Sequence, residues 1–274
     1  MTLRGDDRAV AVQIGAVILL GFLMISLSLY QATVVPNENR EVEFQHNQRV
    51  QSDMLEVRNA ILGTAATGSA SPAAVELGTQ YPTRAVAINP SPPSGTLSTS
   101  SLGTVQVRNA VADDAATTEP DYPETADFWN GTTQNYTTKS LEYRPSYANY
   151  DNAPTTVYEN GLVYNRFRSG NVTRSGQPVV AGTRISLVAL SGNLSRGGTS
   201  SLVVDPEAVS VSTRTISVTD AGSGNVSVVV PSELDADEWQ ELLEESGDYD
   251  PAADSTNGAY VYEVQNHSAG VELY

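Results

Sequence analysis

Residues 9–35 read AVAVQIGAVILLGFLMISLSLYQATVV and contain no charged side chain. A helix needs about 20 apolar residues to cross the hydrocarbon core of a bilayer, so this stretch is long enough. A secretory signal has a shorter apolar stretch of about 7–15 residues and a small-residue cleavage site, and no clear site of that kind follows here. The sequence therefore predicts a transmembrane helix over residues 9–35, preceded by residues 1–8 as a cytoplasmic tail or leader.

The charges that flank this helix barely decide its orientation. Two arginines, Arg4 and Arg8, precede it, and Arg40 and Arg49 follow it within the relevant distance, so the positive-inside rule gives nearly a tie. The tail of residues 1–8 is too short to be a domain, and all the glycosylation sequons described below lie after the helix. We therefore expect a single-pass protein of the cell membrane, with its C-terminal domain outside.

The composition of the 274 residues excludes several functions. Asp and Glu number 32 against 15 Lys and Arg, which gives a net charge of −17, and Lys139 is the single lysine. Such a surface repels nucleic-acid phosphates, so no nucleic-acid partner is expected. The absence of Cys excludes disulfides, thiolate catalysis and Cys-based zinc sites. High acidity with almost no lysine is typical of halophilic proteins, whereas an ordinary acidic secreted protein is the alternative.

The segment 36–63 is polar but keeps one apolar stripe. The members of this stripe are spaced as i, i+4, i+7 and i+11, which places them on one helical face: Val50, Met54, Val57 and Ile61. Gly63 suits a helix end. We expect an amphipathic stalk helix over residues 37–62 that continues from the membrane and packs on the outer domain.

Residues 64–274 are expected to form the extracellular domain. Alternating apolar residues and Gly-rich turns predict short strands at 84–89, 104–110, 155–158, 161–167, 184–190, 201–204, 209–218, 225–230 and 259–264. Residues 89–103 and 112–154 are expected to be irregular. One helix should begin near Ser232 as its N-cap and bury Trp239, Leu242 and Leu243. The predicted fold class is α+β: a long transmembrane and stalk helix, then a mainly antiparallel, sandwich-like β domain with one short C-terminal helix.

Six sequons of the form Asn-x-Ser/Thr give the strongest local signal of chemistry. The candidate N-glycosylation residues are Asn130, Asn135, Asn171, Asn193, Asn225 and Asn266. The first four lie in surroundings typical of loops, whereas Asn225 and Asn266 adjoin expected strands. We expect at least one of the six to carry a glycan, although asparagines in such places are also ordinary turn formers.

Other constellations favour structure over catalysis. Two histidines, His46 and His267, lie far apart in the sequence, and no motif for a nucleophile or phosphate loop is present. A solvated loop is the favoured interpretation of the acidic stretch EESGDYDPAAD, although it offers carboxylates that suit Ca²⁺: Glu244, Glu245, Asp248, Asp250 and Asp254. The tyrosines are expected to pack in the core rather than form a recognition surface: Tyr143, Tyr147, Tyr150, Tyr158 and Tyr164. No catalytic residue, metal site or cofactor is predicted, and the protein is not expected to be an enzyme.

Residues 4–21, RGDDRAVAVQIGAVILLG, resemble the N-terminus of archaeal type IV pilins and flagellin-like proteins. The usual apolar start is similar to AVSPVIG, and Ala11, Val12 and Gln13 differ from its middle. The resemblance implies prepilin-type cleavage between Arg8 and Ala9 and assembly with itself or other pilin-like subunits. Phrases such as DFWNGT and NAPTTVYENG are similar in style to uncharacterised haloarchaeal surface proteins.

The expected function is thus a membrane-anchored, pilin-like structural or adhesion protein of the cell surface. An anchored ligand-binding domain that forms no fibres is the alternative, and an anchored hydrolase is a weaker one.

Overall fold

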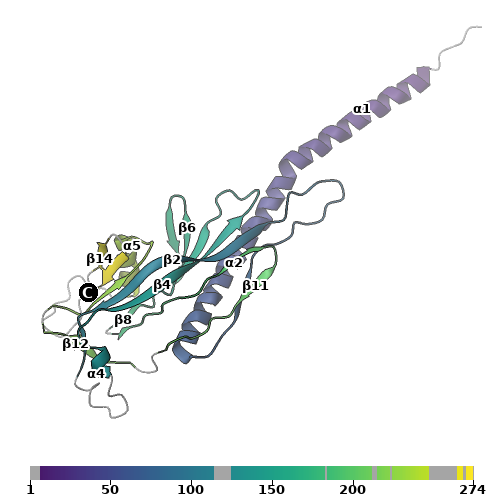
Figure 1. Cartoon of the computed structure of the whole chain (residues 1–274). Helices are drawn as coiled ribbons and strands as arrows, with labels where there is room; N and C mark the ends of the chain where they lie inside the picture. Colours follow the sequence, from purple (N-terminus) through teal and green to yellow (C-terminus); the bar gives the residue numbers. More distant parts are fainter. Residues whose placement is uncertain are drawn as a thin grey trace, which may run out of the picture.

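The computed structural model describes residues 7–113, 125–182, 184–211, 215–222, 224–246, 264–267 and 270–273. A long N-terminal helix leads into a mainly antiparallel β domain with a short helix near the C-terminus (Figure 1). This arrangement confirms the predicted fold class. The acidic loop 247–258 lies outside the described residues.

The helical elements are α1 (Asp7–Leu29), the π-helix η1 (Tyr30–Val34), α2 (Val35–Thr67), α4 (Thr125–Phe128) and α5 (Ala236–Ser246). The strands are β1 (Ala73–Glu76), β2 (Ser94–Arg108), β3 (Ala110–Ala112), β4 (Gln134–Ser146), β5 (Thr155–Glu159), β6 (Leu162–Phe167), β7 (Gly170–Thr173), β8 (Val180–Ala181), β9 (Arg184–Ile185), β10 (Ser195–Gly198), β11 (Ser201–Val204), β12 (Val218–Asp220), β13 (Ser227–Val230), β14 (Val264–His267) and β15 (Gly270–Leu273). Nine of them form one sheet in the order β14-β15-β13-β2-β4-β5-β6-β7, with β10 also paired to β2. Smaller antiparallel pairs join β1 to β11, β12 to β3 and β8 to β9.

The three N-terminal helical segments are one continuous rod with a wider turn in its middle. Pro36 has no N–H to donate, and its ring crowds the carbonyl of Ala32 one turn earlier. The backbone responds just before the proline, where the N–H of Val35 donates to the carbonyl of Tyr30, five residues back. The rod changes direction between α1 and α2 in Figure 1, as expected for a proline next to a π turn.

Helix α2 covers one face of the main sheet. The predicted apolar stripe is buried: Val50, Met54 and Val57 have no exposed surface, and Ile61 is 5% exposed. It packs with side chains from the sheet and from β1, among them Leu97, Leu141, Tyr143, Tyr158 and Val163. The prediction that the helix ends at Gly63 is wrong, because α2 continues to Thr67. Gly68 ends it in the left-handed conformation, with φ 71°, which glycine adopts without strain.

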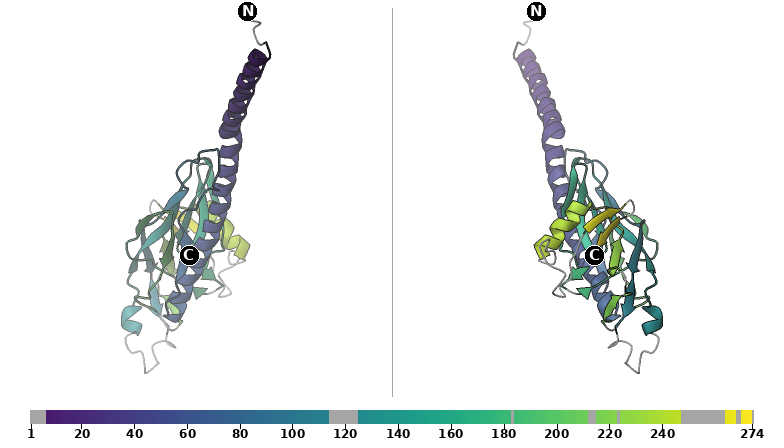
Figure 2. Two further views of the ribbon diagram at one scale, coloured as in Figure 1. Left: turned by 90° about the vertical axis from the view of Figure 1, so that its right-hand side faces the viewer. Right: turned by 90° about the vertical axis from the view of Figure 1, so that its left-hand side faces the viewer.

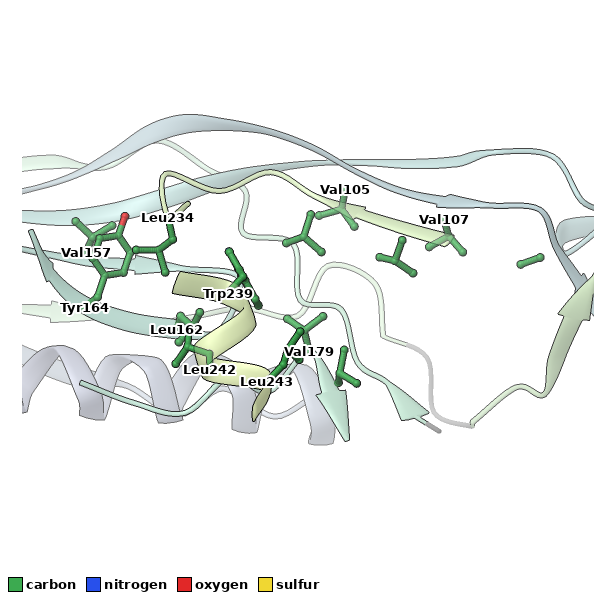
Figure 3. Close-up of a cluster of buried hydrophobic side chains, with 14 residues drawn as sticks. Val105, Val107, Val157, Leu162, Tyr164, Val179, Leu234, Trp239, Leu242 and Leu243 are labelled. Carbon is green, nitrogen blue, oxygen red and sulfur yellow. The ribbon is translucent and has the colours of Figure 1, made fainter. Parts of the chain in front are cut away.

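The opposite face of the sheet is covered by α5. Trp239, Leu242 and Leu243 of α5 belong to the same buried cluster as Val157 and Leu162 of the sheet, and in Figure 3 Leu242 lies beside Leu162. The predicted buried face of this helix is therefore confirmed. The same cluster also includes Val105 and Val107 of β2, and Val179 and Val180 beside them.

One β-bulge explains how β2 serves both faces. The register of β2 against β4 shifts between Ser101 and Gly103, so one extra residue lies in β2. Side chains alternate faces along a strand, and an extra residue reverses that alternation. Leu97 consequently packs on the α2 side, whereas Val105 packs on the α5 side.

Several strand predictions are wrong. Residues 84–89 form no strand, and in the described part of 209–218 the strand begins only at Val218. The interpretation of 89–103 and 112–154 as irregular missed the first half of β2 and the whole of β4, which pair along 13 residue positions. Strand β4 was not recognised from the sequence because its buried residues Thr138, Ser140 and Glu142 are polar and break the apolar alternation. Pairing with two neighbours outweighed this weak local signal.

Candidate functional site at the membrane junction

Helix α1 presents an apolar surface that nothing in the domain covers. Twelve large apolar side chains from Val10 to Leu29 are between 54% and 74% exposed. In the described part of the chain, one helix is long and apolar enough to cross a membrane, and its best 18-residue window has a mean hydropathy of 2.5 with no residue buried. The rod projects away from the domain in both views of Figure 2. The 20 residues from Val10 to Leu29 rise about 30 Å, which matches a hydrocarbon core.

The polar side chains of Ser28 in α1 and Thr33 in η1 form hydrogen bonds within the rod itself. The hydroxyl of Ser28 donates to the carbonyl of Met24 at 2.8 Å, and that of Thr33 donates to the carbonyl of Leu29 at 2.7 Å. Such bonds to the preceding turn remove the need for water, so both hydroxyls are compatible with an apolar surrounding.

The candidate cleavage position lies at the beginning of α1. The helix already includes Asp7, so Arg8 and Ala9 are in its first turn. The side chains of these two residues and the tail 1–6 lie outside the described residues. Cleavage between Arg8 and Ala9 therefore stays a prediction.

The loop 82–92 links the β domain to the end of the apolar helix by hydrogen bonds. The side-chain amide of Gln31, in η1, donates to the carbonyl of Ile88 at 2.8 Å and accepts from its N–H at 2.9 Å. Arg84 of the same loop donates to Glu38 at 2.8 Å and to Asn39 at 3.0 Å on α2. The hydrogen bond to Glu38 raises the pKa of Arg84. The loop is thus held to the rod on both sides of Pro36.

A buried carboxylate holds a second loop against α2. Glu43 has no exposed surface, and its two oxygens accept the backbone N–H groups of Ala148, Asn149 and Tyr150 at 2.9, 2.8 and 2.6 Å. The hydroxyl of Tyr81 and the amide of Asn149 also donate to it. Burial raises the pKa of Tyr81, and the bond to Glu43 adds to the rise. A carboxylate surrounded by so many donors is stable without a cation.

His46 has a structural role in the same region, which we call the junction: the part of α2 that contacts the loop 82–92 and the loop 147–150. Its Nε2 lies 3.0 Å from the carbonyl of Glu76, so this nitrogen must carry the proton, and its Nδ1 accepts from the hydroxyl of Tyr147 at 2.6 Å. Burial lowers the pKa of His46, which favours this neutral form. His46 therefore joins α2 to β1 and to the loop that follows β4. His267 lies in β14, and its side chain is outside the description.

A second polar cluster lies at the base of α5. Glu159 has no exposed surface and accepts hydrogen bonds from Ser232 and from Tyr164, the latter at 3.2 Å. Burial raises the pKa of Glu159 to about 7. Ser232 in turn accepts from the indole N–H of Trp239 at 2.9 Å. A raised pKa would suit an acid catalyst, but Glu159 is covered by its own partners and offers no surface to a substrate.

The predicted role of Ser232 as N-cap is wrong. Helix α5 begins at Ala236, and Asp235 precedes it. The carboxylate of Glu238 accepts the N–H of Asp235 at 2.9 Å, as in a capping box, whereas Ser232 accepts the N–H of Leu234 at 3.0 Å before the helix. The local sequence around Ser232 suggested a helix cap, but it could not show that the hydroxyl donates to the distant Glu159 instead.

The sequons are spread over the β domain. Asn130 is exposed, forms an isolated β-bridge with Val111, and its side chain accepts from Thr132 of its own sequon at 2.7 Å. Asn193 is exposed between β9 and β10. The loop-like interpretation is wrong for Asn135 and Asn171, which lie in β4 and β7. The amide of Asn171 donates to Glu238 at 3.1 Å. Asn225 is exposed before β13, and Asn266 lies in β14 with its side chain outside the description.

The tyrosines divide between core and junction. Tyr143, Tyr158 and Tyr164 have no exposed surface, whereas Tyr147 and Tyr150 are half-buried and stack on each other with ring centroids 6.3 Å apart. The expectation of core packing is confirmed for the first three. In the residues that the structure describes, no group of three His, Asp or Glu side chains is arranged to hold a metal.

The comparisons with known proteins identify no family. No family model matches the chain, and no solved structure matches it. A stretch of 92 residues is 35% identical to an uncharacterised protein of Archaeoglobus fulgidus. The match covers 34% of this chain and 16% of that relative, so the chain spans a small part of the relative's length.

The polar residues that build the junction were not singled out from the sequence. Gln31, Arg84 and Glu43 meet partners between 38 and 107 positions away in the chain. One signal was available for Glu43: an acidic residue close in helical register to the apolar stripe of α2 should be buried with it. No comparable signal marked Gln31 or Arg84.

Proposed function

We propose that the protein is a membrane-anchored, pilin-like structural or adhesion protein of the cell surface, with its acidic β domain outside. One observation carries the proposal: a single rod has an uncovered apolar half, α1, and a half fixed to the domain, α2. Exposing an apolar surface of this length to water is energetically unfavourable, so α1 requires contact with lipid or with copies of itself. The resemblance of residues 4–21 to archaeal pilins supports a role of α1 in the assembly of subunits.

The hydrogen bonds between α2 and the domain support a role of the rod in transmitting force. Glu43 and His46 fix α2 to two loops and a strand by hydrogen bonds that are shielded from water. A force applied to α1 is therefore passed to the sheet rather than to a flexible linker. Such a connection suits a fibre subunit or an adhesin.

The first test is the N-terminal sequence of the mature protein from membranes of a salt-loving archaeon that produces it. A start at Ala9 supports prepilin-type processing, and filaments in the same cells, seen by electron microscopy with an antibody, would support assembly. An intact N-terminus with membrane retention would leave a plain single-pass anchor and contradict the pilin-like part. A start beyond Val35 would contradict anchoring altogether.

Outside placement has its own test. Protease added to intact cells should digest the outer domain, and mass spectrometry of the recovered peptides should find a glycan on at least one of the exposed sequons, such as Asn130 or Asn193. Resistance to protease in intact cells, with digestion after lysis, would contradict this orientation. The net charge of −17 indicates adaptation to high salt. The domain should therefore lose its fold in dilute buffer, where its charges are less screened.

A further inference from the structure

The loop 82–92 exposes apolar side chains beside the membrane helix. Val86 is 70% exposed and Ile88 is 82% exposed, higher fractions than most of the apolar side chains of α1. Arg84 is the one charged residue in this loop, and only 7% of its side chain is exposed because it points to α2. In a chain with a net charge of −17, the tip of this loop is therefore an uncharged apolar surface.

The position of the loop along the rod is fixed by Gln31. This residue bonds both backbone groups of Ile88 and lies two positions after Leu29, the last of the exposed apolar residues of α1. In Figure 1 the loop, coloured blue, extends along the rod past the end of the β domain. Ile88 therefore lies level with the end of the apolar segment, where a membrane surface would be.

Ile88 also has both of its backbone polar groups paired, which suits a place with little water. Unpaired N–H and C=O groups are costly in lipid, and the amide of Gln31 satisfies both groups of Ile88. Asn89 donates to the carbonyl of Pro82 at 2.9 Å and ties the two sides of the loop together. Pro90 and Pro92 have no N–H to leave unpaired.

We propose that the loop 82–92 is a second membrane contact, which inserts Val86 and Ile88 among the lipids of the outer leaflet beside α1. The inference rests on the proposed membrane anchoring and goes beyond it. Lipid is favoured over a protein partner because the apolar tip is continuous with the lipid-facing surface of α1 and lies at its end. Two contacts fix the tilt and rotation of the outer domain on the membrane, whereas one helix would leave the domain free to rotate about its axis.

Site-directed spin labelling of the full chain tests the proposal, since the protein has no cysteine to remove. Single variants Val86→Cys and Ile88→Cys are labelled and reconstituted in vesicles of diphytanoyl phosphatidylcholine. Ile25→Cys in α1 is the reference for lipid, and Val209→Cys is the matched control, because Val209 is 87% exposed in the connection between β11 and β12. The measurement compares collisions of each label with oxygen, which concentrates in lipid, and with a water-soluble nickel chelate.

The proposal expects the labels at positions 86 and 88 to lose most of the chelate access that the label at 209 keeps, as the label at 25 does. If the labels at 86 and 88 behave like that at 209 while the label at 25 is in lipid, the loop lies in water and the inference is wrong although the anchor stands. Chelate access at position 25 would instead contradict the anchor. Loss of access to both reagents, with spin–spin broadening that grows with the protein-to-lipid ratio, would identify a second copy as the occupant and overturn the proposal.

Discussion

Helices α1 and α2 are two halves of one rod that meet opposite surroundings. The first half is almost entirely apolar and its side chains are exposed, whereas the second is mainly polar and buries its apolar stripe against the sheet. The same residue type therefore has different energetic roles in the two halves. A large apolar residue in α2 stabilises the domain, whereas one in α1 is exposed and adds nothing to the packing of the domain. In the experiments that follow, the full chain is kept in detergent micelles and unfolding of the β domain is followed by circular dichroism.

The largest effect is expected from Glu43→Ala. The substitution leaves the N–H groups of Ala148, Asn149 and Tyr150 without their buried acceptor, and it should lower the free energy of unfolding by about 4 kcal/mol. Glu41→Ala is the matched control, because Glu41 lies on the same helix but is exposed, and it should cost less than about 0.5 kcal/mol. Equal effects of the two variants would show that the fixed half of the rod does not depend on its buried carboxylate.

The second prediction compares two methionines of the same rod. Met54 has no exposed surface in α2, so Met54→Ala should lower the free energy of unfolding by about 3 kcal/mol through lost contacts and a cavity. Met24 in α1 is 56% exposed, and Met24→Ala should leave the unfolding of the domain unchanged. A comparable loss from Met24→Ala would mean that α1 and α2 are not energetically distinct.

The third prediction extends the comparison to the two faces of the sheet. Burial raises the pKa of Glu159 to about 7, above its unfolded value, so its protonated form favours folding and the contribution is lost as the pH rises through about 7. Between about pH 5.5 and about pH 7.5, the free energy of unfolding should fall by about 2 kcal/mol on this account. The variant Glu159→Gln should remove this dependence, and Glu43→Gln on the α2 face should not. A pH profile unchanged by Glu159→Gln would contradict the assignment.

The smallest effect is expected at the end of the rod. Gly68 ends α2 with φ 71°, and a side chain is disfavoured there although the space around it is empty. Gly68→Ala should therefore lower the free energy of unfolding by about 1 kcal/mol. Gly63→Ala is the control within the helix, and it should be neutral or stabilising because alanine favours helix and nothing lies near its Cβ. Destabilisation by Gly63→Ala would indicate that the helix ends at Gly63 and not at Gly68.

The sequence by itself determined the features that depend on neighbouring residues. An uninterrupted apolar stretch predicts α1, and a four-residue stripe predicts which face of α2 is buried, because both follow from helical period and the solvent. Alternation likewise predicted β5, β6 and β13, and the apolar side of α5 was evident from Trp239, Leu242 and Leu243.

The tertiary structure alone decided what depends on distant partners. Strand β4 was missed because its buried Thr138 and Ser140 are polar, and its stability comes from pairing with β2 and β5. The bonds of Gln31 to Ile88 and of Glu43 to the loop at 148–150 join segments that no local pattern connects. A hydrogen bond requires two groups at one distance and angle, and only the folded chain brings them there. For this reason the sequence predicted an anchor and a β domain, whereas the junction that fixes one to the other came only from the structure.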